Sequence, residues 1–239
     1  MAPAWEKEFL QGARDGIPIG LGYLSVSFSF GVMAVNLGLP VWAAVVISLT
    51  NLTSAGQFAG VGLMAAGAPL IEMVLTQLVI NLRYSLMSLS LSQKADGTMT
   101  VLHRLICSFF VTDEIFALAS NRRSLSRRYM YGLGLIPILS WTLGTALGAL
   151  AGGLMPAALR SALNVALYAM FIALIVPAAK ERRPVLLVIL LAAGLSCLLR
   201  YAPALSRLSA GFAIIICALT AAFFGAVRWP IREEDRGAS

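Results

Sequence analysis

The stretch from Ser48 to Ser92 reads SLTNLTSAGQFAGVGLMAAGAPLIEMVLTQLVINLRYSLMSLSLS. It consists of two mostly apolar segments of helical length that meet at Gly67-Ala68-Pro69. Polar side chains nevertheless recur inside both segments, at Asn51, Thr53, Ser54, Gln57, Gln77, Asn81 and Arg83. The apolar segments determine the expected fold, and the polar groups inside them are the basis of the functional hypothesis.

The composition of the whole chain indicates an integral membrane protein. Hydrophobic residues make up 59% of the 239 residues, charged residues make up 12%, and the mean hydropathy is +0.84. A soluble domain has about 25% charged residues, so this chain has too few to solvate a globular surface. Its apolar runs reach the roughly 20 residues that span hydrocarbon and do not alternate as barrel strands do. The sequence therefore predicts an all-α integral membrane protein with a single transmembrane domain.

Eight candidate spans follow from the apolar runs, with seven as the alternative if one segment is re-entrant. They are residues 17–37, 41–66, 70–91, 101–120, 130–153, 159–179, 184–202 and 206–228. Residues 4–15 form a short amphipathic segment that is suited to the membrane interface. Basic clusters at 122–128, 180–183 and 228–232 all fall on one side of eight spans, together with the N-terminus. Both termini are therefore expected on the cytoplasmic side, and the +7 net charge needs no nucleic-acid partner.

A weak internal repeat relates residues 16–92 to residues 130–202, with the segment 101–120 as a linking helix. Gly16-Ile17-Pro18 is echoed by Leu135-Ile136-Pro137, and Leu82-Arg83-Tyr84 by Leu199-Arg200-Tyr201. Repeated bundles with a binding site at their interface are common in secondary transporters. If 101–120 spans the membrane, the two three-helix units are parallel, and if it is re-entrant they are inverted.

Polar residues of the second candidate span suggest a lining for a substrate path. Asn51, Ser54 and Gln57 are spaced i, i+3 and i+6, which places them along one face of a continuous helix. A helix break at Ser54-Ala55-Gly56 would fit this reading. The alternative is ordinary hydrogen bonding between helices, which membrane bundles use routinely.

Charged residues in the third and fourth spans are the candidates for binding and ion coupling. Arg83 is expensive inside a membrane and is a functional candidate, although it can also snorkel to the interface. Asp113 and Glu114 point about 100° apart on a helix, so they cannot face one partner equally. Either acid can pair with Arg83 or Arg200 while the other titrates; the alternative is a purely structural ion pair.

Enzyme and metal signatures are missing from the sequence. The single histidine, His103, precedes Arg104 near an expected membrane boundary and is interpreted as interfacial. The cysteines are scattered through apolar runs, and no HExxH, GxSxG or phosphate-binding loop occurs. The sequence thus predicts no enzymatic activity, no cofactor and no metal site, and any transport must be driven by a gradient or by another chain.

The motifs taken together resemble the azaleucine-resistance (AzlC-like) branched-chain amino acid permease family over nearly the full length. They are Gly12, Gly16-Ile17-Pro18, Phe30-Gly31, Ser54-Ala55-Gly56-Gln57-Phe58-Ala59-Gly60, Asn81-Leu82-Arg83-Tyr84, Thr112-Asp113-Glu114 and Ala169-Met170-Phe171-Ile172-Ala173-Leu174 with Pro177. The resemblance implies an exporter of branched-chain or similarly hydrophobic amino acids in the bacterial inner membrane. It also implies a small membrane partner subunit of the AzlD type.

One motif departs from the family pattern. Where the family usually has Leu-Asp-Phe-Ala-x-Pro-Ala, this chain has Leu163-Asn164-Val165-Ala166-Leu167-Tyr168-Ala169. An aspartate there would titrate, whereas Asn164 cannot. If the family's aspartate takes part in ion coupling, this protein is expected to couple differently or to take another substrate.

A binding scheme for a zwitterionic amino acid follows as a hypothesis. Arg83 with Asn81, and a helix N-terminus near Ser54–Gln57, would receive the carboxylate. Asp113 or Glu114 would receive the ammonium group or carry the coupled proton. Aromatic and thioether side chains, namely Phe30, Phe58 and Met170, would contact the apolar side chain. The alternatives are a non-catalytic membrane scaffold subunit and an exporter of a different small metabolite.

Overall fold

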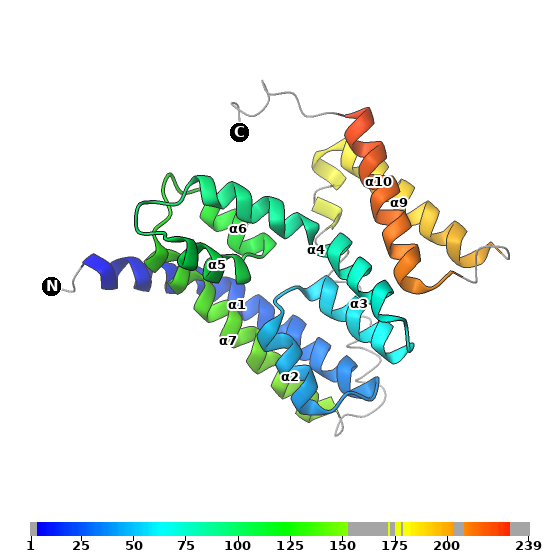
Figure 1. Cartoon of the computed structure of the whole chain (residues 1–239), viewed down its shortest axis with the longest axis horizontal. Helices are drawn as coiled ribbons and strands as arrows, with labels where there is room; N and C mark the ends of the chain where they lie inside the picture. Colours follow the sequence, from blue (N-terminus) through cyan, green and yellow to red (C-terminus); the bar gives the residue numbers. More distant parts are fainter. Residues whose placement is uncertain (1–3, 153–171, 173–174, 178, 203–207, 230–239) are drawn as a thin grey trace. The chain divides into compact units, whose positions relative to one another are not determined.

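The computed structural model describes residues 4–152, 172, 175–177, 179–202 and 208–229, and its elements there are all helices (Figure 1). The chain forms two compact units. The first comprises Met1–Ala65 with Asn81–Asn164, and the second comprises Ala66–Ile80 with Val165–Ser239.

Five helices in the described ranges are long and apolar enough to cross a membrane. They are α1 (Ala4–Asn36), α4 (Leu70–Gln93), α7 (Arg127–Gly152), α9 (Arg183–Tyr201) and α10 (Ala210–Arg228). The predicted class, an all-α integral membrane protein, is confirmed. The candidate span 159–179 lies mostly outside the described residues.

Two predicted continuous spans are each divided into two short helices. The segment 41–66 forms α2 (Val41–Thr50) and α3 (Ser54–Ala65), and the segment 101–120 forms α5 (Val101–Phe109) and α6 (Asp113–Ser120). Helices of 8 to 12 residues rise about 12–18 Å, well short of a hydrocarbon core about 30 Å thick. The prediction that the segment 41–66 is one spanning helix was wrong, and its break lies at 51–53 rather than at the suggested 54–56. For the segment 101–120, the structure agrees with the re-entrant alternative rather than with a spanning helix.

Residues 4–15, the predicted amphipathic segment, are the first turns of the continuous helix α1. Gly12 in this part packs against the backbone of Tyr129 and Leu133 in α7. The N-terminal turns are therefore tied to the bundle by a backbone contact.

The helices α1 and α7 form the centre of the first unit and lie side by side (Figure 1). Gly16 of α1 packs on Leu133 of α7, and Gly31 packs further along on Thr145. Since the contacts advance together along both helices, α1 and α7 run parallel. Glycines at the contact let the two backbones approach closely, as small residues do in membrane helix pairs.

Gly31→Ala is expected to lower the free energy of unfolding by about 1–3 kcal/mol, the usual cost of overpacking. An added Cβ atom would press on Thr145 O and lie 2.6 Å from Ala149 N, both backbone atoms that cannot move aside. Gly22→Ala on the same helix is the matched control, since its Cβ atom would meet nothing within 4 Å. Thermal unfolding in detergent compares the two variants, and equal midpoints would contradict the packing described above.

The pair α5–α6 is a re-entrant hairpin, since both of its ends lie beside the first turn of α7. Near the start of α5, His103 lies 2.7 Å from the side chain of Arg127, and after the end of α6 the Leu125 N–H donates to Lys94 O. The tip of the hairpin instead reaches Tyr23 near the middle of α1. The structure thus combines a re-entrant 101–120 segment with parallel α1 and α7, which the sequence did not predict.

The helices α1 and α7 are parallel although 101–120 is re-entrant, because the segment 41–66 also forms a hairpin of two short helices. The helix α2 leaves the C-terminal end of α1 and reaches Thr145 of α7 through Ser48. The helix α3 then runs back from the tip of the α2–α3 hairpin, and its Phe58 packs against Phe30 in the later part of α1. The part of α4 in this unit runs antiparallel to α7, from Arg83 at one hairpin tip to its end beside Leu125.

Candidate functional site

The tip of the α5–α6 hairpin explains the acidic pair in the sequence. Thr112 adopts an extended conformation and caps α6, with its Oγ1 atom accepting from the Ile115 N–H at 3.4 Å. Asp113 and Glu114 are then the first two residues of the helix. Carboxylates are stabilised there by the positive end of the helix dipole, which is why two adjacent acids are tolerated among apolar neighbours.

Arg83 and Asp113 form an ion pair at this tip. The Arg83 Nη1 atom lies 2.8 Å from Asp113 Oδ2, and each side chain is 43% exposed. Arg83 also donates to the Tyr84 hydroxyl at 3.1 Å. Of the two arginines predicted as partners for the acidic pair, the structure therefore pairs Arg83, rather than Arg200, with Asp113.

Glu114 has a different partner from Asp113. The Tyr23 hydroxyl lies 2.6 Å from Glu114 Oε2 and 2.6 Å from Thr112 Oγ1. The Tyr23 hydroxyl group has one proton, so it can donate to the Glu114 carboxylate while it accepts from the Thr112 hydroxyl group. These contacts anchor the α5–α6 tip to the middle of α1, which is 91 residues away in sequence from Glu114.

The tip of the α2–α3 hairpin is held by a buried chain of hydrogen bonds. The indole N–H of Trp141 donates to Gln57 Oε1 at 2.7 Å, and Gln57 Nε2 donates to Ser48 Oγ at 3.0 Å. Ser48 in turn lies 2.6 Å from Thr145 Oγ1. All four side chains are at most 2% exposed, so each polar group in this series of hydrogen bonds depends on its neighbour for a hydrogen-bond partner.

The predicted line of Asn51, Ser54 and Gln57 along one helix face was wrong, because α2 ends before Asn51. Ser54 is the first residue of α3, so a half-helix N-terminus does stand at this position. The hydroxyl group of Thr53 caps this helix, because its Oγ1 atom accepts a hydrogen bond of 3.3 Å from the Gly56 N–H. Gln57 is used in packing the tip against α7.

The two hairpin tips are connected through one aromatic contact. The rings of Tyr23 and Trp141 meet edge to face with their centroids 5.2 Å apart. Tyr23 anchors the α5–α6 tip, and Trp141 anchors the α2–α3 tip. The N-termini of the half-helices α6 and α3 therefore lie near the middle of the α1–α7 pair. Binding sites of this kind, built from broken helices at mid-membrane, are typical of secondary transporters.

Sequence reasoning missed Tyr23 and Trp141. The available signal was their position in the middle of apolar segments, since membrane tyrosines and tryptophans usually lie at the interfaces. Ser48 and Thr145 carried no signal of their own, because isolated hydroxyls are common in membrane helices.

The candidates for contact with an apolar substrate side chain are only partly placed. Phe58 is 8% exposed and Phe30 is fully buried, and their rings pack edge to face at 5.4 Å. Asn81 lies on α4 two residues before Arg83. Met170 and Asn164 lie outside the described residues.

The opposite, basic end of the α5–α6 hairpin is structural. Arg122 lies 3.6 Å from Asp15 and over the ring of Tyr129, and His103 lies 2.6 Å from the Tyr131 hydroxyl. The N-terminal part of α1 and the basic loop at 122–128 thus share one end of the first unit, as the predicted topology requires. Which side of the membrane this end faces stays a prediction.

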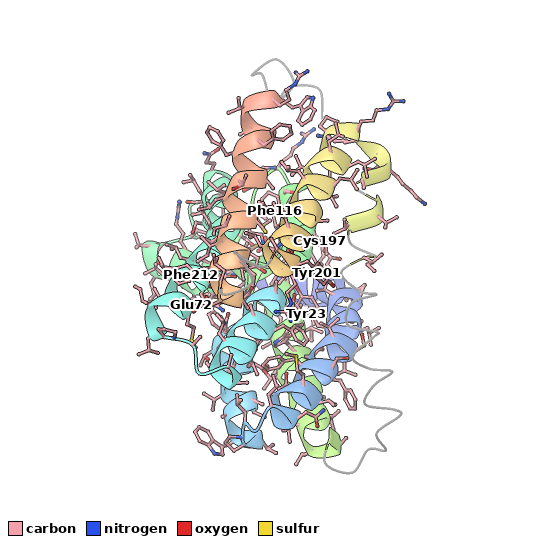
Figure 2. The ribbon with its side chains drawn as sticks, turned by 90° about the vertical axis from the view of Figure 1, so that its right-hand side faces the viewer. Tyr23, Glu72, Phe116, Cys197, Tyr201 and Phe212 are labelled. Carbon is pink, nitrogen blue, oxygen red and sulfur yellow. The ribbon has the colours of Figure 1, made fainter. Side chains whose placement is uncertain are left out.

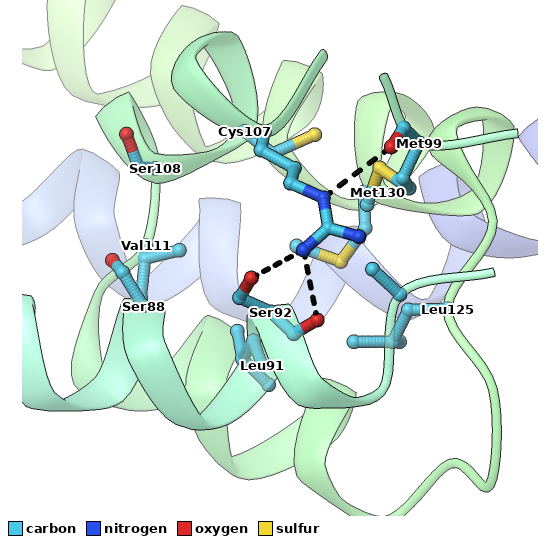
Figure 3. A pocket seen from close by; sticks show the side chains of 11 residues that line it. Ser88, Leu91, Ser92, Met99, Cys107, Ser108, Val111, Leu125 and Met130 are labelled. Atoms are coloured by element: carbon cyan, nitrogen blue, oxygen red, sulfur yellow. Dashed lines mark hydrogen bonds between the residues drawn. The ribbon is translucent and has the colours of Figure 1, made fainter. Parts of the chain in front are cut away.

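A small pocket lies between α4, α5 and the start of α7 (Figure 3). Its cavity of about 40 Å³ is lined by Ser88, Leu91, Ser92, Ala95, Met99, Arg104, Cys107, Ser108, Val111, Leu125 and Met130. Arg104 spans it, donating to Ser92 O, Ser92 Oγ and Met99 O. A space of this size holds at most a few waters. The pocket therefore belongs to the packing of the hairpin base and is too small for an amino acid.

Comparisons with known proteins identify the family of the chain. The profile of the AzlC protein family matches residues 18–155. Inner membrane protein YgaZ of Escherichia coli (strain K12) is 30% identical over 183 residues, which cover 73% of this chain and 75% of YgaZ. A membrane protein of Archaeoglobus fulgidus is 33% identical over 176 residues, covering 73% of this chain and 77% of that protein. No solved structure matches the chain. The protein belongs to the AzlC family, a family of membrane proteins with a role in transport.

Proposed function

We propose that this protein is the large subunit of a secondary transporter that exports branched-chain or similarly hydrophobic amino acids. The observation that supports the proposal is the Arg83–Asp113 ion pair at the N-terminus of the half-helix α6. A charged pair inside a membrane bundle is expensive and marks a functional site by default. Both side chains are half exposed, so a ligand can reach them without unfolding the tip.

The pair offers the two charges that a zwitterionic amino acid needs. The guanidinium group of Arg83 binds a carboxylate through two parallel hydrogen bonds. The carboxylate of Asp113 then binds the ammonium group of the same substrate. Substrate binding thus replaces one ion pair by two, which keeps every charge neutralised in a medium of low dielectric constant.

The remaining tip residues set the geometry of this site. Tyr23 holds both Thr112 and Glu114 against α1, and this orients the first turn of α6 toward Arg83. The half-helix N-terminus at Ser54 supplies partial positive charge at the other tip. Phe58 and Met170 are proposed to contact the apolar side chain, with Asn51 and Asn81 as further polar contacts.

The cellular setting of the proposal comes from the family. YgaZ is an inner membrane protein, and we place this chain in the bacterial inner membrane with both termini in the cytoplasm. A small AzlD-like membrane subunit is the proposed partner. An ion gradient is the proposed energy source.

Export from intact cells tests the function. Cells that express the chain, with and without the small subunit, are preloaded with dipeptides that release labelled valine, leucine or methionine. We expect faster export of at least one of these amino acids when both subunits are present. If correctly inserted protein accelerates the export of none of them, the amino-acid proposal is wrong, and another small metabolite or a scaffold role must be considered.

A further inference from the structure

The second unit contains a buried acidic side chain that has no role in the site described above. Glu72 in the first turn of α4 is only 1% exposed. Its Oε1 atom accepts a hydrogen bond of 2.8 Å from the backbone N–H of Gly211 in α10. Figure 2 shows Glu72 beside Phe212 at the start of α10.

Glu72 acts as the cap of a helix that belongs to another part of the chain. The N-cap residue of α10, Ser209, makes no capping hydrogen bond with its own side chain. The carboxylate of Glu72 takes its place and lies at the positive end of α10. A Cβ atom on Gly211 would lie 2.5 Å from Glu72 Oε1 and 2.7 Å from Thr76 Oγ1, so the contact requires glycine.

Two hydroxyl groups at this contact are available for hydrogen bonding. Thr76 is fully buried one turn after Glu72, and neither Thr76 Oγ1 nor Ser209 Oγ has a hydrogen-bond partner among the described residues. A hydroxyl group can donate to a carboxylate and can equally accept from a carboxylic acid. The surroundings of Glu72 can therefore satisfy both of its protonation states.

Nothing charged compensates Glu72 in the described part of the second unit. The titratable or charged side chains of α9 and α10 are Arg183, Cys197, Arg200, Tyr201, Cys217 and Arg228, and none of them forms an ion pair with Glu72. On α4 itself, Arg83 lies eleven residues further along and is paired with Asp113. Arg207 belongs to the connection between α9 and α10, outside the described residues. The Gly211 N–H and the N-terminus of α10 are thus the described groups that stabilise the Glu72 carboxylate.

We propose that Glu72 is the binding site of the coupling proton, an assignment that rests on the gradient-driven transport proposed above. The carboxylate takes a proton from water on one side of the membrane and releases it on the other. Protonation removes the negative charge from the N-terminus of α10 and weakens the bond to Gly211. Proton binding is thereby linked to the contact between α4 and α10.

An assay of the reconstituted transporter separates proton coupling from substrate binding. The full chain, with its small subunit, is placed in liposomes and assayed with labelled leucine in two modes. One mode is exchange of internal for external leucine at equal pH, and the other is accumulation driven by a pH gradient. In Glu72→Gln the amide oxygen still accepts from the Gly211 N–H. We therefore expect unchanged exchange but no gradient-driven accumulation.

Matched variants make the result specific to this carboxyl. Glu181→Gln changes an exposed acid of the same unit and should leave both modes unchanged. Loss of gradient-driven accumulation in Glu114→Gln, with retention in Glu72→Gln, would overturn the assignment. Accumulation that follows a sodium gradient instead of a pH gradient would overturn it as well.

Infrared spectra give a readout that needs no substrate. Difference spectra of the wild-type protein between acidic and alkaline pH should contain a buried carboxylic-acid band that is absent from Glu72→Gln. If no such band exists, Glu72 does not bind the proton, whatever the transport result. If wild-type protein shows the band but exchanges no amino acid, the proposed function fails and the protonation of Glu72 stands.

Discussion

Arg83→Gln is expected to reduce amino-acid export by roughly 10- to 150-fold while membrane insertion is retained. The substitution removes the only side-chain cation that lies against Asp113 within the described residues. The substrate carboxylate then loses its charged donor, and the Asp113 carboxylate is left uncompensated. Hydrogen bonds to charged groups contribute about 1.5–3 kcal/mol, which corresponds to a loss of roughly 10- to 150-fold in transport rate. Initial rates of export, normalised to the amount of inserted protein, measure the effect.

Arg122→Gln is the control, because it breaks a second arginine–aspartate contact at the other end of the same hairpin. Arg122 lies 3.6 Å from Asp15, and its exposure is similar to that of Arg83. We expect transport to persist in this variant. Arg83→Lys should transport weakly, since lysine keeps the charge but not the planar two-donor fork. Full transport in Arg83→Gln would disprove the binding scheme.

Gln57→Leu is expected to have the largest effect on stability, lowering the free energy of unfolding by about 2–4 kcal/mol. Leucine fills a similar volume but leaves the Trp141 indole N–H without its acceptor and Ser48 without its donor. Both groups are buried, and a buried polar group without a partner costs about 1–3 kcal/mol. Thermal unfolding in detergent, followed by tryptophan fluorescence, measures the loss. The exposed Gln93 gives the control substitution Gln93→Leu.

A second substitution tests whether the stability loss comes from the orphaned indole. Trp141→Phe removes the N–H group and keeps an aromatic ring, so it should cost less in the Gln57→Leu background than in the wild-type protein. Such a coupling between the two sites is the signature of a direct interaction. If the two losses simply add, the hydrogen bond does not hold the α2–α3 tip.

Composition and apolar runs were sufficient to predict the membrane class and five helices long enough to span a membrane, and they singled out the charged residues for which a transport role is proposed. Length and hydrophobicity are sufficient for the spans, because hydrocarbon requires about 20 apolar residues that satisfy their own backbone. The same argument singles out Arg83, Asp113 and Glu114, since charges are costly in that environment wherever they lie. The motifs that resemble the AzlC family pointed to the same three residues.

The folded structure was needed to show that the segments 41–66 and 101–120 are pairs of half-helices. Each segment has the length and apolar content of a span, and the break depends on partners distant in sequence. Thr112 and Glu114 meet Tyr23 of α1, and Gln57 meets Trp141 of α7. Glu72 likewise meets Gly211 only through folding. Local sequence cannot show such contacts, because a helix end in a membrane is stable only where other elements satisfy its free backbone groups.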